Sequence, residues 1–544
     1  MANKKRTKRR PNEQSHKNQG ACKCDLSPKV LRCVTELVSD IRQSSSLAQM
    51  ATAAMRGVRK LGVVLLREIL HERDRPYRRR EVTVFCPACR HVAQKRGKKL
   101  HEKKRYTLLG KVSYNRCQYE CGACVRRFFP LDETLGLMAS LRGHENGFAK
   151  SLVLFCTLMP FGKGCEIFER CYGFGISTHL ARSLTFMIGR RLVEMEMQRA
   201  EELWKLRLER PDIFEPPPAQ LRQSKRHKRI YVMEDASKIG VQNGQRGRKA
   251  PKTKTLRKML MHTKSKAIKL AKRNKANPED LQALADEMSD LLREEEGSWR
   301  DIRALLIFTE DDLAQVSKKR REILRRRVVG HVGTKEEWIQ LVHMALHEEG
   351  VYTAEEVVIV ADGGPGIWEL FDELLPSTSE RKVFQILDWY HAVQKLWTVG
   401  RALKGHKTDK HRKACAQWVK TLVDYLAEGK VSNVLQRLRK IKNASGDGSD
   451  ALRKAIKYFE THRHRMHYRD FRNRGMTIGS GAMESIHAWV FQPRCRLPGM
   501  RWSVQGANAM IRLRCSWASG RWDDDFAAAA DPPSENSQEF KAAA

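Results

Sequence analysis

Two short apolar segments that each end in an aspartate constrain the fold of this chain more than any other feature of its sequence. Residues 230–237 read IYVMEDAS and residues 356–364 read EVVIVADGG, so Asp235 and Asp362 follow runs rich in valine and isoleucine. Such runs are typical of strands that are buried inside a sheet. Because other parts of the chain have helical patterns, we expect an α/β fold.

Two interpretations of these aspartates remain open. Asp and Gly are common where a strand ends in a turn, and that alone explains either residue. A carboxylate beside a buried strand is nevertheless costly unless it is hydrogen-bonded, paired or metal-bound. The glycines that follow Asp362 leave room for a ligand. Two such aspartates in a highly basic chain favour a metal site.

A third acid follows a Gly-Ser-Gly turn much later in the chain. Residues 477–490 read TIGSGAMESIHAWV, which places Glu484 about one turn inside a helix-like segment. On its own, Glu484 can be an ordinary acid at a helix N-terminus. With Asp235 and Asp362 it would supply the hard oxygen ligands that Mg²⁺ or Mn²⁺ prefers. Two such ions, about 3.5–4 Å apart, promote phosphodiester displacement.

The charge of the chain indicates a polyanionic partner. Its 544 residues contain 103 Lys and Arg against 63 Asp and Glu, a formal net charge of +40. Nucleic acid is the expected partner, and a membrane surface is the rival. No apolar run reaches the length of a membrane span, and no signal peptide is visible, so we expect an intracellular protein. The cysteines are then expected as metal ligands or thiols rather than disulfides.

Two C-x₂-C pairs predict a structural zinc site. Cys86 and Cys89 form the first pair, and Cys121 and Cys124 form the second, with 31 residues between the pairs. Two such turns can complete a tetrahedral Zn²⁺ site and stabilise a segment with little apolar core. Cysteines paired by coincidence are the alternative, and Cys117 is a spare that competes for the fourth place. The intervening Lys- and Arg-rich segment suits a ribbon that contacts phosphates.

Two further regions suit DNA binding. Residues 162–192 predict two helices joined by a glycine-containing turn, the second of them opened by Ser177 or Thr178, as in a helix-turn-helix or a plain helical hairpin. A basic segment after Glu484 offers guanidinium groups for phosphates and a ring for stacking, unless these side chains are structural. Its members are Arg494, Arg496, Arg501 and Trp502.

Longer motifs surround these residues: FFPLDETLGL (128–137), YVMEDAS (231–237), VVIVADGGPGIW (357–368), ILDWYHAVQKL (386–396), GSGAMESIHAWV (479–490), LPGMRWSVQGANAMIRLR (497–514) and SGRW (519–522). With the paired cysteines, they resemble the DDE transposases of bacterial insertion sequences, in particular the ISKra-type group, and more distantly the Mutator-like transposases. The resemblance covers roughly residues 80–522. Ala236 departs from it, because this group has glycine at that place.

The resemblance implies a ribonuclease-H-like catalytic core with Asp235, Asp362 and Glu484 as its metal-binding triad. It implies a bacterial, cytoplasmic, nucleoid-associated enzyme that binds transposon ends and target DNA and acts as a homo-oligomer on paired ends. Asp388 and His391 form a D-x₂-H pair that resembles a motif near the active site of Mutator-like relatives. A helix-capping aspartate beside a satisfied histidine explains this pair equally well.

The expected organisation combines these features with changes of composition along the chain. A basic flexible arm (1–28), a helical region (29–79), a zinc ribbon (80–130), a helical DNA-binding region (131–210) and a linker (211–229) precede the core. The core has a first part (230–396, with a helical insertion at about 252–300), an all-helical insertion (397–475) and a last part (476–522), and a disordered acidic tail (523–544) follows.

Two other functions remain open at this stage. A non-catalytic zinc-ribbon DNA-binding protein, such as a regulator derived from a transposase, would use the ribbon and the helical region alone. A structure-specific nuclease on the same core would cut DNA without joining it.

Overall fold

The computed structural model divides into two compact units, which we describe separately. The N-terminal unit comprises Met1–Phe148 with Tyr172–Phe174, and the C-terminal unit comprises Ala149–Cys171 with Gly175–Ala544. The expected basic arm up to residue 26, nearly all of the expected insertion at 252–300, and the chain end from residue 531 lie outside the described residues. The described residues are 27–136, 141–214, 227–241, 299–317, 320–364, 366–405, 407–441, 446–497 and 500–530.

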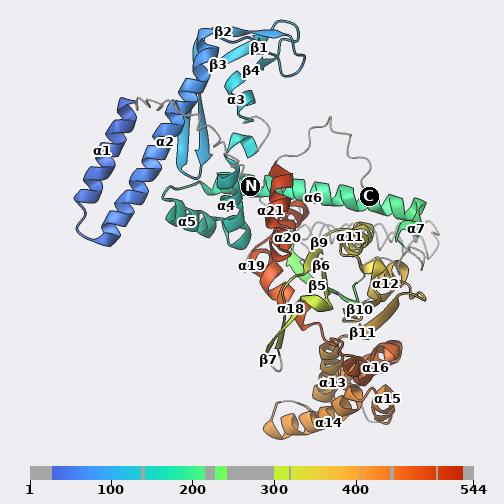
Figure 1. The fold of residues 1–544 in the computed structure, drawn as a ribbon. Coiled ribbons are helices and arrows are strands. Elements are labelled where there is room, and N and C mark those ends of the chain that lie inside the picture. The colour runs from blue at the N-terminus through green and yellow to red at the C-terminus, as the bar shows by residue number, and fades with distance from the viewer. Residues whose placement is uncertain are drawn as a thin grey trace, which may run out of the picture. The chain divides into compact units, whose positions relative to one another are not determined.

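The N-terminal unit packs a long helical hairpin against a four-stranded antiparallel sheet. The expected helical region forms two helices, because the chain breaks at residues 43–46 and Ser46 caps the second by accepting a hydrogen bond from Gln49 N. Helix α2 packs on β3, where Val112 and Tyr114 are buried. The elements (Figure 1) are α1 (Pro28–Arg42), α2 (Leu47–Arg79), β1 (Val84–Phe85), β2 (Val92–Thr107), β3 (Gly110–Cys121), β4 (Arg127–Phe128), α3 (Pro130–Thr134) and η1 (Leu141–Gly143).

The C-terminal unit is built around a five-stranded mixed sheet of order β11-β10-β5-β6-β9. Strands β5, β10 and β11 run parallel, whereas β5, β6 and β9 pair antiparallel. Four of these strands match apolar segments of the sequence. The fifth, β9, is a short segment behind a run of arginines and carries no such signal. The strands are β5 (Arg229–Gly240), β6 (Trp299–Thr309), β9 (Arg327–His331), β10 (Glu356–Ala361) and β11 (Lys382–Leu387), beside the separate hairpin β7 (Leu313–Ser317) and β8 (Arg320–Ile323).

Helices cover both faces of this sheet. On one face, the Trp338 indole of α11 donates to Glu234 Oε1 at 2.8 Å, and burial raises the pKa of Glu234 to about 7. On the other face, a Cβ at Gly330 would meet Ile511 and Phe491. The covering elements are α6 (Thr178–Glu209), α11 (Lys335–Glu348), α12 (Ile367–Leu374), α18 (Gly481–Ile486), the π-helical turn η5 (His487–Phe491), α19 (Gln492–Cys495), α20 (Val504–Ala518) and α21 (Trp522–Ala530).

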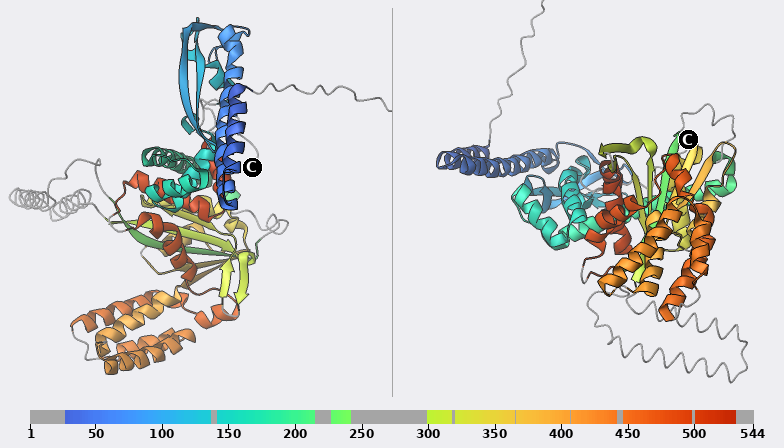
Figure 2. Two further views of the ribbon diagram at one scale, coloured as in Figure 1. Left: turned by 90° about the vertical axis from the view of Figure 1, so that its left-hand side faces the viewer. Right: turned by 90° about the horizontal axis from the view of Figure 1, so that it is seen from below.

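The region expected to be an all-helical insertion is helical throughout its described part. Its four longer helices pack side by side (Figure 2) around buried Val, Leu and Phe side chains. The elements are α13 (Trp389–Lys404), α14 (Asp409–Ala427), α15 (Val431–Arg439), α16 (Gly446–Thr461), η4 (Arg463–Arg465) and α17 (Tyr468–Asn473). The other helices among the described residues are α4 (Asn146–Leu158), α5 (Phe161–Tyr172), α7 (Pro211–Phe214), η2 (Glu310–Asp312) and η3 (Val351–Thr353).

Two expected irregular segments are partly helical, which corrects the prediction for each. The acidic run at 523–525 is not the start of a disordered tail. It opens α21, where Phe526 is buried and Asp525 forms ion pairs with Arg512 and Arg521. The linker expected from residue 211 begins with α7, where Phe214 packs its ring on His343 and other rings. No helix among the described residues is long and apolar enough to cross a membrane.

Candidate functional site

The sheet places the first two predicted acids on neighbouring strands. Strands β5 and β10 are parallel and pair Glu234 with Ala361, so Asp235 and Asp362 follow at the next position of each strand. Side chains at the same register of neighbouring strands project to the same face of a sheet. Both aspartates are half-buried. The two residues, 127 positions apart in sequence, therefore lie side by side on one face of the sheet. Asp362 directly follows the last residue of β10, as expected, whereas Asp235 lies within β5, which continues to Gly240, so the prediction of a strand end at Asp235 is wrong.

Each aspartate also accepts a local backbone hydrogen bond. Ala236 N donates to Asp235 Oδ1 at 2.7 Å, and Gly364 N donates to Asp362 Oδ1 at 2.8 Å. The strand-end interpretation is therefore correct for Asp362, and it does not exclude a ligand on the remaining oxygen. Ala236 continues strand β5 opposite Arg303 rather than entering a turn, so the site needs no glycine there.

The loop after Asp362 is held by helix α16. Gly363 has φ +81°, and a Cβ there would lie 3.0 Å from His462 Nε2. Tyr458 Oη donates to the Asp362 carbonyl oxygen at 3.0 Å. Burial lowers the pKa of His462 to about 4, so that its ring is neutral near pH 7. These contacts fix the backbone that carries Asp362.

The buried carboxylate of Asp388 joins the start of α13 to the Gly-Ser-Gly turn. It accepts hydrogen bonds from Tyr390 N at 3.0 Å, Ser480 N at 3.2 Å, Ser480 Oγ at 2.6 Å and His391 Nδ1 at 2.6 Å. Asp388 thus caps α13, as the simpler interpretation expects, and it also anchors the turn that leads to Glu484. This second contact explains the serine between the two glycines.

Hydrogen bonding and charge set the protonation of this pair. Burial raises the pKa of Asp388, but the hydrogen bonds from His391 and Ser480 outweigh it and leave the pKa below the ordinary value. The hydrogen bond to Asp388 raises the pKa of His391, and the charges of Asp362 and Asp235 raise it further. The imidazole therefore lies within electrostatic reach of both predicted metal ligands.

Helix α18 presents Glu484 in its first turn, where its side chain is exposed. One turn later, buried His487 places Nε2 3.4 Å from Asp235 Oδ2. This contact brings the Glu484 helix to strand β5. His487 was not among the predicted site residues, although its spacing of three from Glu484 put it on the same side of a helix.

The segment that carries His487 is a π-helical turn, and two of its carbonyl groups accept hydrogen bonds from Arg514. Arg514 donates from Nε to Val490 O, from Nη2 to Trp489 O at 2.5 Å, and from Nη1 to Thr157 O at 2.8 Å. A π-helical turn interrupts the regular bonding of a helix, and such turns are frequent at functional sites. Arg514 supports these carbonyl groups from the C-terminal side.

The three predicted acids do not form a closed cluster. In the part of the chain that the structure describes, three or more His, Cys, Asp or Glu ligand atoms lie within 4.8 Å of one another only at the four cysteines. Asp235 and Asp362 follow paired residues of adjacent strands, and the part of Glu484 in the site stays a prediction.

The predicted DNA-contact residues divide into two pairs. Arg494 is 1% exposed, donates to Cys156 O at 3.0 Å and lies over the Phe161 ring, so it is a structural residue rather than a phosphate contact. Trp502 is also buried, at 7% exposure, which leaves no free face for a base, and its backbone forms an isolated bridge to Val241, the residue after β5. Arg496 and Arg501 are exposed and remain predictions.

The four predicted zinc ligands come together in the N-terminal unit. Cys86 Sγ lies 3.6 Å from Cys124 Sγ, and Cys89 Sγ lies 3.5 Å from the Sγ atoms of both Cys121 and Cys124. The backbone N–H of Cys89 lowers the pKa of Cys86 to about 6, and that of Cys124 lowers the pKa of Cys121. Each loop therefore stabilises a thiolate before any ion binds.

Cys117 does not belong to this cluster. It is fully buried on β3, and its Sγ lies 3.7 Å from Asp74 Oδ1. Burial raises the pKa of its thiol to about 11. Its expected competition for the fourth ligand position is therefore absent.

Comparisons with known proteins give little. No protein-family model matches the sequence, and no curated protein matches it. Among solved structures, the chain is similar to the Drosophila P element transposase strand transfer complex, with 11% identity over 70% of this chain and 81% of that chain. The TM-score of 0.23 is too low to assign a fold.

Proposed function

We propose that this chain is a DDE-type DNA transposase, which cleaves DNA at the ends of a mobile element and joins those ends to a target. The observation that supports this most is that Asp235 and Asp362 directly follow Glu234 and Ala361, which pair with each other on two adjacent parallel strands. The Asp388 network and the His487 contact then bring the helix of Glu484 towards these strands. A mixed sheet whose last strand, β11, is separated from the Glu484 helix by helices α13 to α17 agrees with a ribonuclease-H-like core.

The donor set fits divalent metal ions. Asp235, Asp362 and Glu484 offer carboxylate oxygens, which Mg²⁺ and Mn²⁺ prefer. Two bound ions would activate the attacking oxygen and stabilise the leaving oxygen of a phosphodiester. The protein itself fixes the Asp362 loop through Tyr458 and holds the His391 imidazole beside the acids.

The N-terminal unit would supply DNA binding. Four thiolates suit a tetrahedral Zn²⁺ ion with no open position, which makes the site structural rather than catalytic. Strand β2 carries a run of Lys and Arg side chains, most of them exposed, as a phosphate-binding surface requires. We also propose that helices α5 and α6 contact DNA and that several copies of the chain assemble on paired ends.

The test is a strand-transfer assay with the full-length protein in Mg²⁺ or Mn²⁺, on DNA ends taken from inverted repeats flanking the reading frame. Asp235→Asn, Asp362→Asn and Glu484→Gln should each lower transfer by at least about 1000-fold, because each removes a metal ligand. Asp409→Asn, at an exposed acid that pairs with Arg412 at the start of α14, is the matched control. DNA binding should persist in all four variants.

Each other outcome selects a different function. Cleavage without joining would indicate a nuclease on the same core. Salt-sensitive binding with no metal-dependent cleavage by the wild-type protein would indicate a DNA-binding regulator. Normal transfer by all three acid variants would show that the metal ligands lie elsewhere.

A further inference from the structure

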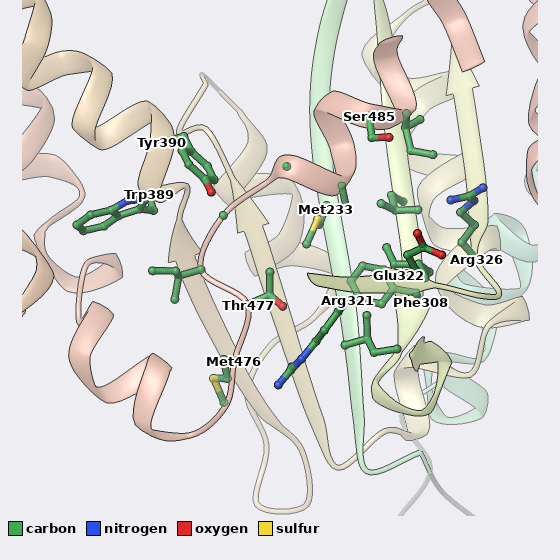
Figure 3. A pocket seen from close by; sticks show the side chains of 18 of the residues that line it. Met233, Phe308, Arg321, Glu322, Arg326, Trp389, Tyr390, Met476, Thr477 and Ser485 are labelled. Carbon is green, nitrogen blue, oxygen red and sulfur yellow. The ribbon is translucent and has the colours of Figure 1, made fainter. Parts of the chain in front are cut away.

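A large groove lies beside the candidate site in the C-terminal unit (Figure 3) and has a volume of about 1240 Å³. Its floor is apolar and includes Met233 and Phe308 of the central sheet. Trp389 and Tyr390, at the start of α13, lie on one side, and Arg326 lies on the opposite side (Figure 3). The catalytic proposal assigns no role to this groove.

The groove combines exposed aromatic rings with positive charge. Tyr390 is 59% exposed and Trp489 is 46% exposed, which is unusual for large rings that line a groove. The charged lining residues are Arg321, Arg326, Arg472 and Glu322, three cations against one anion. Surfaces that bind single-stranded nucleic acid combine these two features, with rings for bases and cations for phosphates.

Two tryptophan rings that line the groove are held in place by the surrounding fold. Trp389 meets Tyr468 edge-to-face at 5.0 Å, and Arg472 lies 5.9 Å from the Trp389 ring centre. Trp489 packs against Trp517 at 4.5 Å, and Arg326 lies 5.5 Å from the Trp489 ring centre. Rings fixed in this way need little further ordering when a base stacks on them.

Residues close in sequence to two of the predicted metal ligands line the groove. Met233 and Asp235 are two positions apart on β5 and project to the same face. Ala482 and Ser485 line the groove and flank Glu484 on α18. Tyr390 lies in the first turn of α13, directly after Asp388 and Trp389. A strand leaving the acids along this face would pass into the groove.

We propose that the groove binds an unpaired segment of DNA, with bases stacked on Tyr390 and Trp489 and phosphates beside Arg321 and Arg326. This inference rests on the proposed function, which would supply the unpaired DNA at the ends of the mobile element. The charge excess favours a nucleic acid over an apolar helix or a second copy of the chain. Unpaired DNA is favoured over duplex because only unstacked bases present their faces to protein rings.

The test measures binding of a fluorescent oligothymidine of about 12 nucleotides, within the usual site size, to the full-length protein in EDTA. A duplex of equal length is the comparison ligand. Tyr390→Ala and Trp489→Ala should each weaken single-strand binding by roughly 10-fold, and duplex binding much less. Tyr390→Phe and Trp489→Phe keep a ring and should bind nearly as well as wild type, as should the exposed surface variant Leu324→Ala.

Three outcomes would overturn the proposal: single-strand binding unchanged by both alanine variants, equal loss of duplex binding, or a changed oligomeric state in light scattering with binding intact. The last would make the groove an interface between copies. Because no metal is present, the assay is independent of catalysis. If the wild-type protein binds the oligothymidine through the groove but shows no strand transfer, only the proposed function is rejected. If the wild-type protein transfers strands but both alanine variants bind the oligothymidine as tightly as wild type, only the groove proposal is rejected.

Discussion

The cysteine cluster of the N-terminal unit and the carboxylate site of the C-terminal unit are assembled in different ways. Each C-x₂-C loop directs backbone N–H groups at its own first cysteine, and one strand pairing, β2 with β3, brings the two loops together. The carboxylate site instead needs β5, β10 and α18, whose acids are separated by more than a hundred residues in sequence.

This difference predicts where each site is vulnerable. The cysteine cluster lies over a small core, so its integrity should depend on its ion. The carboxylate site lies on a large hydrophobic core, so it should tolerate loss of metal but respond to changes in the residues that position its backbone. The following experiments separate these two kinds of dependence.

Removal of one cluster ligand should have the largest structural effect. Cys121→Ser should abolish stoichiometric zinc binding and unfold the sheet of the N-terminal unit, because a structural Zn²⁺ supplies on the order of 10 kcal/mol of folding free energy. Zinc content and limited proteolysis with mass spectrometry measure this, and the sheet of the C-terminal unit should stay protected. Cys117→Ser, at the buried cysteine outside the cluster, should retain zinc. Full zinc content in Cys121→Ser would contradict the assignment.

A smaller effect is expected from Arg514, which supports the π-helical turn. Arg514→Met would leave the carbonyls of Val490, Trp489 and Thr157 without their donor, so the free energy of unfolding should fall by about 3 kcal/mol or more. Urea denaturation of the C-terminal unit measures this. Arg496→Met, at an exposed position, should change it by less than about 0.5 kcal/mol. Equal stability of the two variants would mean that the turn needs no such support.

The same contrast explains what the sequence predicts well. Cys86, Cys89, Cys121 and Cys124 were identified from spacing alone, because short loops determine how they meet. The aspartates were found because buried strands leave an apolar pattern that ends at Asp235 and Asp362. The strand β9 was missed because five residues behind a run of arginines do not form a recognisable pattern.

Tertiary contacts determine the burial and the partners of several residues that the sequence alone does not predict. Nothing in the order of residues distinguishes buried Arg494 from exposed Arg496, since both occur in one basic run. His487 gains its contact only when α18 packs on β5. The acidic run at 523–525 looked like a tail because its partners, including Arg512, lie on another helix.

The Asp388–His391 pair should make stability depend on pH. The pKa of Asp388 is lowered from 3.8, so its contribution is present above that value and is lost as pH falls through the folded pKa. The pKa of His391 is raised from 6.5, so its contribution is complete below 6.5 and is lost as pH rises through the folded pKa. The pair therefore stabilises most between about pH 4 and 6.5.

Asp388→Asn removes the negative charge and can place the amide NH₂ group opposite the donors His391 Nδ1 and Ser480 Oγ. It should lower the free energy of unfolding by about 2 kcal/mol at pH 5.5, and by less at pH 8.5, because His391 loses its proton as pH rises through its folded pKa. Urea denaturation at the two pH values measures the difference. Ser480→Ala keeps the charged pair, so its smaller destabilisation should not depend on pH. An Asp388→Asn effect of equal size at both values would mean that His391 is not charged in the folded protein.

The smallest effect concerns two glycines of the candidate site that differ in what surrounds them. Gly363 has φ +81°, and an added Cβ would press on His462 and Leu387, so Gly363→Ala should cost about 1–2 kcal/mol and disturb Asp362. Gly481 opens α18 with no atom within 4 Å of an added Cβ, so Gly481→Ala should be neutral or stabilise by up to about 1 kcal/mol. Thermal denaturation and strand transfer compare the two variants. Both glycines lie within three residues of a predicted metal ligand, so loss of activity in Gly363→Ala alone would show that the backbone conformation, and not proximity, positions Asp362. Equal behaviour of the two variants would contradict the role given to the Asp362 loop.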